Sequence, residues 1–321
     1  MILVCGEALI DLFLGEADGT VLAARALAGG SPFNVALGLV RLGAPVGFFG
    51  GVSTDRFGTF LEQTMAREGI GTGWLKRSAR PTPLAVISTD ATGHPAYTFH
   101  AHDCAERDLL SADLPSPDPA ITAIVLGSYT LAVEPVGSTL LALAERDAGR
   151  LVVSVDPNLR PSVVGDLHAW RQRFDRFARA ATIIKLSRED LSAAYGEDAD
   201  PAACAARWLA DGALLVVITD GAAGATAYHS GHRLHWPGRP VAVVDAVGAG
   251  DTFHAALLAR LAQQGLLTRA ALATLDAASL ADLLRYAITA ASITCTRRGA
   301  DLPSRADVEA ILIGEPDVPR A

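Results

Sequence analysis

The fold is decided by the stretch Val244-Asp245-Ala246-Val247-Gly248-Ala249-Gly250-Asp251-Thr252-Phe253-His254. The apolar run Val241 to Val244 predicts a strand that leads into a glycine turn, and Asp251 stands where a helix over Thr252 to Gln263 is predicted to begin. Glycines let successive backbone N–H groups converge and a helix N-terminus adds about +0.5 charge, so the turn can hold a phosphate. An ionised Asp251 would reach the same point and could accept a proton from a hydroxyl during phosphoryl transfer. A Gly-x-Gly-Asp string by itself favours a simple helix cap, so the rest of the chain has to decide between the two interpretations.

Size, charge and cysteine usage exclude several classes of protein. A chain of 321 residues with 50% hydrophobic residues can bury a large core, as one large domain or two. A formal net charge of −8 leaves no basic stripe for a nucleic-acid backbone, so no nucleic-acid partner is expected. The cysteines are far apart and form no C-x-x-C pair, which predicts buried free thiols in a reducing cytoplasm rather than a zinc site or a disulfide framework; they are Cys5, Cys104, Cys204 and Cys295. The N-terminus starts with a strand-like run without a basic leader, and no apolar run reaches about 18 residues, so no membrane association is expected.

Short apolar runs alternate with helical stretches along most of the chain. The helical stretches include Phe57 to Glu68 and Pro135 to Asp147. Continuous apolar strands between helices are typical of a parallel sheet covered on both faces, so the sequence predicts a three-layer α/β/α fold with a mostly parallel central sheet. The strand-like runs are Val46 to Phe49, Ile124 to Leu126, Leu151 to Val155, Thr182 to Ile184 and Leu214 to Thr219.

Two segments break this alternation and predict a small second sheet. Leu84 to Thr89 and Pro95 to His100, joined by the turn Ala91-Thr92-Gly93-His94, are typical of an antiparallel hairpin, and Leu12 to Leu27 is extended around a turn at Asp18-Gly19. They form the only antiparallel pattern that we find, and such a sheet suits a lid over a site. The predicted division is an α/β/α domain over residues 1–11, 28–82 and 104–314, a β lid over 12–27 and 83–103, and a frayed tail over 315–321. Exposed strand edges in the lid favour pairing of two copies, so we expect a homodimer.

Polar residues near the N-terminus stand where a ligand could approach the chain. Asp11 follows the first strand, and Gly29-Gly30 precedes Asn34 at the start of a helix that Ser31 is predicted to cap. Asp and Asn side chains can hold sugar hydroxyls, and paired glycines let a ligand approach the backbone closely. Each feature alone also suits a capping carboxylate or a tight turn.

Together these motifs resemble those of the ribokinase/PfkB-type carbohydrate kinases, and in particular their fructokinase-like members. The resemblance covers almost the whole chain. It rests on Gly29-Gly30 with Asn34, Asp156-Pro157-Asn158-Leu159-Arg160, Thr219-Asp220-Gly221-Ala222-Ala223-Gly224, and Asp245 to Phe253. It implies a ribokinase-like fold and the ATP-dependent transfer of a phosphoryl group to a sugar hydroxyl.

The resemblance also implies a role for individual residues. Asp251 would be the catalytic base, beside an anion hole formed by Gly248, Ala249 and Gly250. The sugar would be bound, together with Asp251, by Asp11, Gly29, Gly30, Asn34 and Arg160. ATP would be bound by Lys185, Thr219, Gly221, Gly224, Gly248 and Gly250. Arg160 is the natural candidate to meet phosphate charge in this acidic protein, although a surface ion pair would also explain it.

ATP and Mg²⁺ are the implied cofactors, with K⁺ as a further candidate. The Asn-x-x-Glu element that the family links to magnesium appears here as Ser187-Arg188-Glu189-Asp190, so Asp190 would hold a magnesium-bound water. The loop for the monovalent cation would comprise Asp245, Val247 and Gly299.

Fructose is the acceptor that the resemblance favours, with fructose 6-phosphate as the product, because Gly127 to Pro135 is similar to a stretch in fructokinases. Two departures concern the sugar. His100-Ala101-His102-Asp103 stands where many fructokinases have Arg and Asn, and Phe33 replaces a small residue, so that it is expected to narrow the pocket or else to lie in the core.

Other functions stay open or are excluded on the same residues. The alternatives are a 2-keto-3-deoxygluconate kinase, a ribose or nucleoside kinase, and a non-catalytic sugar-binding sensor of the same fold. A P-loop NTPase is excluded because the only lysines, Lys76 and Lys185, do not lie in a G-K-[ST] string. A Rossmann dehydrogenase is disfavoured because Gly248-x-Gly250 lies late in the chain and continues without the third glycine.

Overall fold

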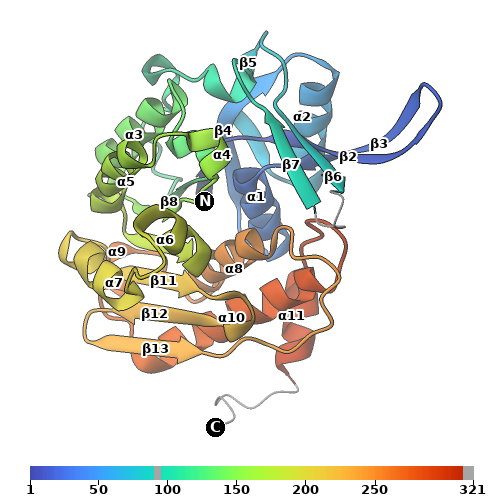
Figure 1. Cartoon of the computed structure of the whole chain (residues 1–321). Coiled ribbons are helices and arrows are strands. Elements are labelled where there is room, and N and C mark those ends of the chain that lie inside the picture. Colours follow the sequence, from blue (N-terminus) through green and yellow to red (C-terminus); the bar gives the residue numbers. More distant parts are fainter. Residues whose placement is uncertain (90–94, 314–321) are drawn as a thin grey trace.

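The chain is described by a computed structural model that covers residues 1–89 and 95–313, and these residues form two sheets (Figure 1). The larger sheet has nine strands in the order β13-β12-β11-β10-β9-β8-β1-β4-β5, and the strands from β11 to β5 in this order are parallel. Their bounds are β1 Ile2–Cys5, β4 Val46–Ser53, β5 Gly71–Ser78, β8 Ala123–Gly127, β9 Val152–Asp156, β10 Ile183–Ser187, β11 Leu215–Thr219, β12 Ala225–His229 and β13 His232–Trp236. The predicted α/β architecture with a mostly parallel central sheet is confirmed.

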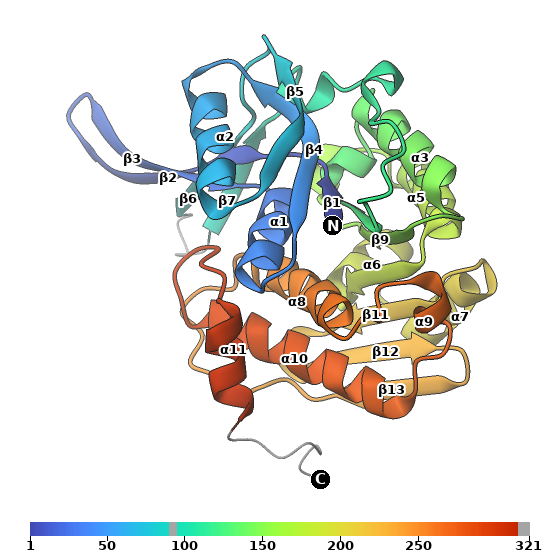
Figure 2. The ribbon, with the colours of Figure 1, turned by 180° about the vertical axis from the view of Figure 1, so that it is seen from behind.

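Helices cover both faces of this sheet, as expected for strands that are apolar along their whole length. In β1, Ile2 and Val4 belong to one core while Leu3 and Cys5 belong to the other, because successive side chains of a strand point to opposite faces. Figure 2 looks onto the first layer, which contains α1 (Ser31–Arg41), α2 (Arg56–Glu68), α8 (Ala249–Gln263), α9 (Arg269–Leu272), α10 (Ala277–Cys295) and α11 (Arg305–Leu312). The opposite layer contains α3 (Val136–Asp147), α4 (Pro161–Val164), α5 (Leu167–Ala180), α6 (Arg188–Tyr195) and α7 (Pro201–Ala210).

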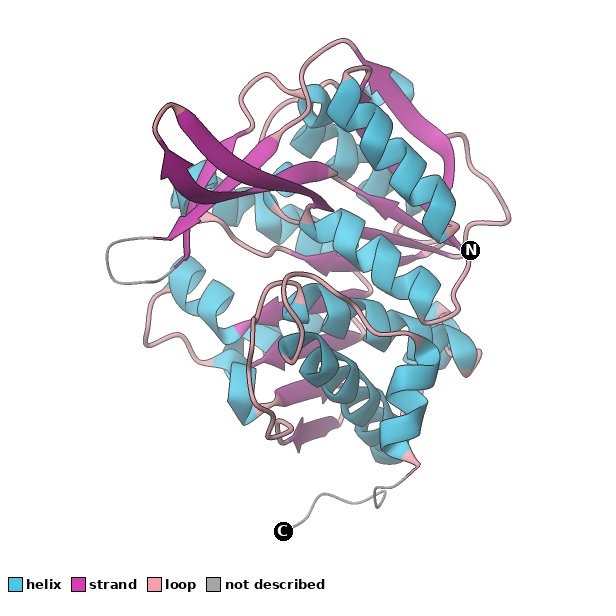
Figure 3. Cartoon of the chain, turned by 90° about the vertical axis from the view of Figure 1, so that its right-hand side faces the viewer, coloured by secondary structure: helices cyan, strands magenta, loops and turns pink. Residues whose placement is uncertain are grey.

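The smaller sheet has four strands in the order β3-β2-β6-β7. It pairs two hairpins from distant parts of the chain, since β2 (Leu9–Asp18) and β3 (Val21–Gly29) join β6 (Leu84–Thr89) and β7 (Pro95–His100) through the parallel β2–β6 ladder. The hairpin of β2 and β3 projects away from the body of the molecule (Figures 1 and 3). The predicted second sheet is therefore confirmed, while the predicted turn Ala91 to His94 and the predicted tail 315–321 lie outside the described residues.

The parallel strands place their carboxyl ends along one edge of the central sheet. Gly127 at the end of β8 pairs in register with Asp156 at the end of β9, and Ser187 at the end of β10 pairs with Thr219 at the end of β11. Side chains that follow these strands therefore gather at one edge, which is where open α/β sheets bind their ligands.

The segment before the glycine turn differs from the prediction. Residues Val241–Val244 form no strand: Val243 and Val244 are exposed, and the backbone N–H of Val244 donates to the carbonyl of Cys295 instead of to a sheet. The following helix begins at Ala249 rather than at Thr252. The backbone of this segment is instead tied to the end of α10, so its apolar side chains stay at the surface and add no strand to the sheet.

One further expectation about packing was wrong. The small sheet is not the only antiparallel element, because β12 and β13 continue the central sheet antiparallel to β11. Of the two positions expected for Phe33, the structure has the core: its side chain is 1% exposed and packs between α1 and the sheet. The cysteines are free, as predicted, but Cys204 and Cys295 are only half-buried.

Among residues 1–89 and 95–313, no helix has the length and apolar character needed to cross a membrane.

Candidate active site

The turn that was predicted to hold a phosphate closes directly onto the N-terminus of α8. Gly248 is the residue before the helix and has a φ of 77°, a left-handed conformation that glycine adopts without strain. The first backbone N–H groups of any helix have no partner within the helix and carry its positive dipole end. Gly250 supplies such a group in the first turn of α8, while the N–H of Ala249 donates to the carbonyl of Ala246 at 3.2 Å and closes the turn. The turn can therefore bind an anion at the helix N-terminus.

Asp251 lies in that first turn and is held by two side chains from α1. The hydroxyl of Ser31 donates to Oδ1 at 2.6 Å, and the amide of Asn34 donates to Oδ2 at 2.9 Å. Ser31 was predicted to cap α1, but the residue before that helix is Gly30 and the Ser31 side chain makes no cap. Burial raises the pKa of Asp251, while Ser31, Asn34 and the charge of Lys185 oppose the shift.

Asp11 approaches the same region from β2 and requires a glycine beside it. A Cβ atom on Gly29 would lie 2.1 Å from Asp11 Oδ2, so only glycine leaves room for this carboxylate. Burial, together with the nearby charge of Asp251, raises the pKa of Asp11 to about 6. The structure thus brings together four of the residues predicted to bind sugar: Asp11, Gly29, Asn34 and Asp251.

A buried lysine supplies positive charge next to the anion turn. The ammonium of Lys185, at the middle of β10, donates to Asp156 Oδ2 at 2.7 Å and is 3% exposed. A Cβ on Gly250 would lie 3.3 Å from Lys185 Nζ, so the ammonium faces the turn. Burial disfavours its charged form, but Asp156 and the carboxylates beyond it raise the pKa of Lys185 above its usual value. Arg160, in contrast, is exposed and donates to the carbonyl of Leu159 at 3.2 Å.

A histidine that the sequence did not single out completes this buried cluster. His254 follows Asp251 by three residues on α8, so both side chains lie on one face of the helix. Its Nε2 is 2.7 Å from the hydroxyl of Ser154, and its Nδ1 is 3.8 Å from Asp156 Oδ2. Burial, with the charge of Lys185, lowers the pKa of His254 to about 3, so the imidazole is neutral. The three-residue spacing between Asp251 and His254 in the sequence was the signal that could have identified this histidine.

Asp190 lies at the start of α6, and its carboxylate is largely occupied by donors from Ser187 and Leu159. Its Oδ2 accepts from the backbone and hydroxyl of Ser187 at 3.0 and 2.6 Å, and Oδ1 accepts from Leu159 N at 2.7 Å. Ser187 and Asp190 form a reciprocal capping box. One lone pair of Oδ1 is left and can accept a hydrogen bond from a water.

The residues predicted to bind the nucleotide follow β11 at the same edge of the sheet. Thr219 ends the strand, and Gly221 begins a short turn that is closed by a hydrogen bond from Asp220 N to the carbonyl of Gly224 at 2.8 Å. Gly224 lies against the segment after β13. Because β10 and β11 are in register, this turn is adjacent to the strand that carries Lys185.

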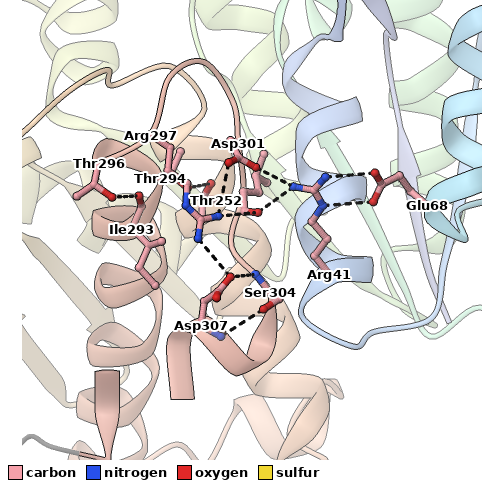
Figure 4. A network of polar contacts seen from close by, with 11 residues as sticks. Arg41, Glu68, Thr252, Ile293, Thr294, Thr296, Arg297, Asp301, Ser304 and Asp307 are labelled. Carbon is pink, nitrogen blue, oxygen red and sulfur yellow. Dashed lines mark hydrogen bonds and ion pairs between the residues drawn. The ribbon is translucent and has the colours of Figure 1, made fainter. Parts of the chain in front are cut away.

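The three residues predicted for a monovalent cation also lie together. Asp245 Oδ1 accepts from Val247 N at 3.0 Å, and Oδ2 accepts from Gly299 N at 2.8 Å. The loop that carries Gly299 is anchored to α1 and α11, as Figure 4 shows: Arg41 donates to Asp301 and Arg297 donates to Asp307, both at 3.3 Å. A Cβ atom on Gly248 would lie 2.8 Å from the Cβ of Ala300, so this loop borders the anion turn and is fixed by α1, which also carries Asn34.

The segment His100 to Asp103, which stands where many fructokinases have Arg and Asn, begins at the end of β7. His100 ends the strand, His102 lies beyond it, and both side chains are exposed.

These features define a site for moving a phosphoryl group to a hydroxyl. A carboxylate that can accept a proton, an anion turn and a buried cation meet at the carboxyl edge of an α/β sheet. The family model described as pfkB family carbohydrate kinase matches residues 1–307. The chain belongs to this family of carbohydrate kinases.

Known relatives agree with this assignment. The chain is 39% identical over 280 residues to a fructokinase of Rhizobium leguminosarum bv. trifolii, covering 87% of this chain and 85% of that protein. A fructokinase of Xylella fastidiosa with bound ATP superimposes with a TM-score of 0.89 at 28% identity, covering 97% of this chain and 98% of the other. A fructokinase of Vibrio cholerae O395 with bound fructose, ADP and calcium ion gives a TM-score of 0.81 at 28% identity and the same coverage.

Proposed function

We propose that this carbohydrate kinase transfers the γ-phosphoryl group of ATP to fructose and releases fructose 6-phosphate. The observation that carries the proposal is the position of Asp251, held by Ser31 and Asn34 at the start of α8 beside the ammonium of Lys185. Fructokinases at up to 39% identity favour fructose over 2-keto-3-deoxygluconate, ribose and nucleosides.

In the proposed reaction the acceptor hydroxyl attacks the γ-phosphorus, the bond from that phosphorus to the bridging oxygen of ADP breaks, and the hydroxyl proton passes to Asp251. The backbone N–H group of Gly250 and the Lys185 ammonium stabilise the charge on the transferring group. Asp11 and Asn34 orient the sugar, with Gly29 and Gly30 leaving room for it. Lys185 faces the anion turn, whereas the exposed side chain of Arg160 would bind the sugar or phosphate only after it turns inward on ligand binding.

The nucleotide and metal assignments are part of the same proposal. The turn from Thr219 to Gly224, including Gly221, would hold the nucleotide beside Lys185. Asp190 fits a magnesium-bound water through the remaining lone pair of Oδ1, and Mg²⁺ would neutralise phosphate charge when bound. Asp245, with the backbone of Val247 and Gly299, would bind K⁺, a role supported by the closure of the two loops on that carboxylate.

We also propose that residues 12–27 and 83–103 move as a lid on the domain formed by 1–11, 28–82 and 104–314, and that two chains pair through it. Val21, Leu22 and Leu27 on β3 are 66%, 53% and 39% exposed, an apolar strip on a projecting hairpin. Light scattering should give twice the chain mass for the wild type and a single chain mass for Leu22→Asp. A wild-type monomer at micromolar concentration would refute the pairing. Free thiols support a cytoplasmic location.

The activity is tested by ADP release with a panel of fructose, 2-keto-3-deoxygluconate, ribose, nucleosides and no sugar. Fructose should give the highest kcat/KM, and the product should be consumed by a coupling enzyme specific for fructose 6-phosphate. Higher kcat/KM for another acceptor would change the substrate. Sugar binding without ADP release for any acceptor would identify a non-catalytic sensor instead.

A further inference from the structure

The catalytic carboxylate is held by the first turn of another helix. Ser31 and Asn34 lie 220 and 217 residues before Asp251, yet each donates to one of its oxygens, at 2.6 and 2.9 Å. Asp251 is 6% exposed, so these protein donors replace much of the hydration that an ionised carboxylate has in water. The Ser31 contact is the shorter of the two.

The hydroxyl of Ser31 has no competing structural task. It is the first residue of α1, but the helix is preceded by Gly30 and receives no side-chain cap. A serine at a helix start ordinarily caps the backbone. Here the Ser31 hydroxyl is the donor to Asp251, because an ionised carboxylate oxygen can only accept. Short O–H···O⁻ hydrogen bonds are among the stronger ones in proteins.

We propose that Ser31 is a positioning residue for the proposed base: it fixes the Asp251 carboxylate and keeps it ionised while the acceptor hydroxyl approaches the remaining lone pairs. The inference rests on the proposed role of Asp251 and adds a residue that the sugar and nucleotide motifs do not assign. Asn34 can use its carbonyl oxygen for the sugar, whereas the Ser31 proton is committed to the base.

The charges around Asp251 determine the direction of the expected effect. Asp11 on β2 and Asp156 on β9 disfavour ionisation of Asp251, and Lys185 on β10 favours it. His254 on the same helix is neutral. Loss of the Ser31 donor removes a stabilising contact from the ionised form only, so the acid limb of the kcat profile must move to higher pH.

The test compares Ser31→Ala, Ser31→Cys and Ser31→Thr with the wild type, with kcat measured from pH 5 to 9 at saturating sugar and ATP. At saturation, the effect of Asp11 protonation on sugar binding does not enter kcat, which reports groups that ionise in the bound complex. Ser31→Ala should shift the acid limb upward by about one to two pH units, since a hydrogen bond to a charged group has that effect on a pKa. Ser31→Cys, a weak donor of similar volume, should shift in the same direction, and Ser31→Thr should restore the wild-type limb.

An unchanged acid limb in both Ser31→Ala and Ser31→Cys would overturn the inference. So would a rise in the KM for sugar alone, which would make Ser31 a sugar contact, or an equal shift in Ser31→Thr, which would indicate a steric effect. Asp251→Asn distinguishes failure of the proposed base from failure of the Ser31 inference. If Asp251→Asn retains more than a tenth of the wild-type kcat, Asp251 is not the base. If Asp251→Asn is inactive and the acid limb of Ser31→Ala is unchanged, only the role of Ser31 is refuted.

Discussion

The buried residues Asp251, Lys185 and His254, which we call the active-site floor, and the four-stranded sheet differ in how much of each is buried. On the floor, Asp251, Lys185 and His254 are at most 6% exposed, and each contacts a partner from another element. In the small sheet, residues 21–27 of β3 are exposed, and the hairpin projects from the body (Figure 3). Groups that stabilise a transition state act best when they do not reorganise, whereas a segment with few buried contacts can open and close at low cost. The comparison therefore contrasts a buried, preorganised group of side chains with the sheet that we propose as a lid.

The largest effect should follow a change to the floor at its proposed base. Asp251→Asn keeps the shape of the side chain and removes the proton acceptor, so kcat should fall about 10²- to 10⁴-fold while sugar binding is largely kept. Steady-state kinetics and calorimetric sugar titration measure the two quantities. Asp211→Asn, an exposed carboxylate at the end of α7, is the matched control and should leave both unchanged. If Asp251→Asn keeps more than a tenth of the wild-type kcat, Asp251 is not the catalytic base.

The two lysines offer a matched test of how rigidly the floor is built. Lys185→Met leaves Asp156 as a buried charge without its main partner, so the free energy of unfolding should fall by about 3 to 5 kcal/mol. Lys76→Met breaks a half-buried pair with Asp113 and should cost about 1 kcal/mol or less. Urea unfolding of both variants gives the comparison. Equal losses in the free energy of unfolding would mean that the Lys185–Asp156 pair stabilises the fold no more than the half-buried Lys76–Asp113 pair does.

Phe33 tests where the floor ends and the core begins. Truncation in Phe33→Ala should lower the free energy of unfolding by about 3 to 5 kcal/mol, because the ring is 1% exposed in the core. The ratio of kcat/KM for fructose and ribose should stay within about two-fold. Val21→Ala on the exposed strand should change stability by about 0.5 kcal/mol or less. A changed ratio of kcat/KM for the two sugars, with an unchanged melting temperature, would indicate that Phe33 lines the sugar pocket.

Asp11 joins the two regions, since it belongs to β2 and faces Asp251. Its pKa is raised to about 6, so it is ionised above that pH and gains a proton below it. A protonated carboxyl accepts hydroxyl protons less well, so the KM for sugar should rise about ten-fold per pH unit below 6, measured at constant ATP. Asp11→Asn should give a high KM that no longer depends on pH in this range. A wild-type KM that is flat from pH 5 to 7 would contradict the role of Asp11.

The smallest expected effect concerns the cover itself. Saturating fructose should slow amide hydrogen exchange about ten-fold in residues 12–27 and 84–89, while β1 and β8 keep their rates. Mass spectrometry of exchanged peptides resolves these segments. If exchange in the small sheet stays constant in an enzyme that turns over, the contrast between a fixed floor and a mobile cover fails.

Local patterns alone predicted much of this molecule. The parallel strands, both hairpins of the small sheet and the turn before α8 follow from side-chain periodicity and from glycine and proline punctuation, which act over a few residues. The resemblance in Gly29-Gly30, Asn34 and the stretch around Asp251 also indicated the family, because these residues must have this spacing for the chemistry to work. The prediction of a strand at Val241 to Val244 was wrong because the partner of this segment is the end of α10, which local sequence does not reveal.

Only the tertiary structure decided which polar groups meet. The sequence cannot indicate that Ser31 donates to a carboxylate 220 residues away instead of capping its own helix, or that Lys185 rather than Arg160 faces Gly250. It also gives no sign that His254 is held neutral beside Asp156. These outcomes depend on the register of the parallel strands and on the packing of α1 against α8, which are set by the whole core. The residue types were determined by the sequence, and their partners, charge states and exposure were determined by long-range packing.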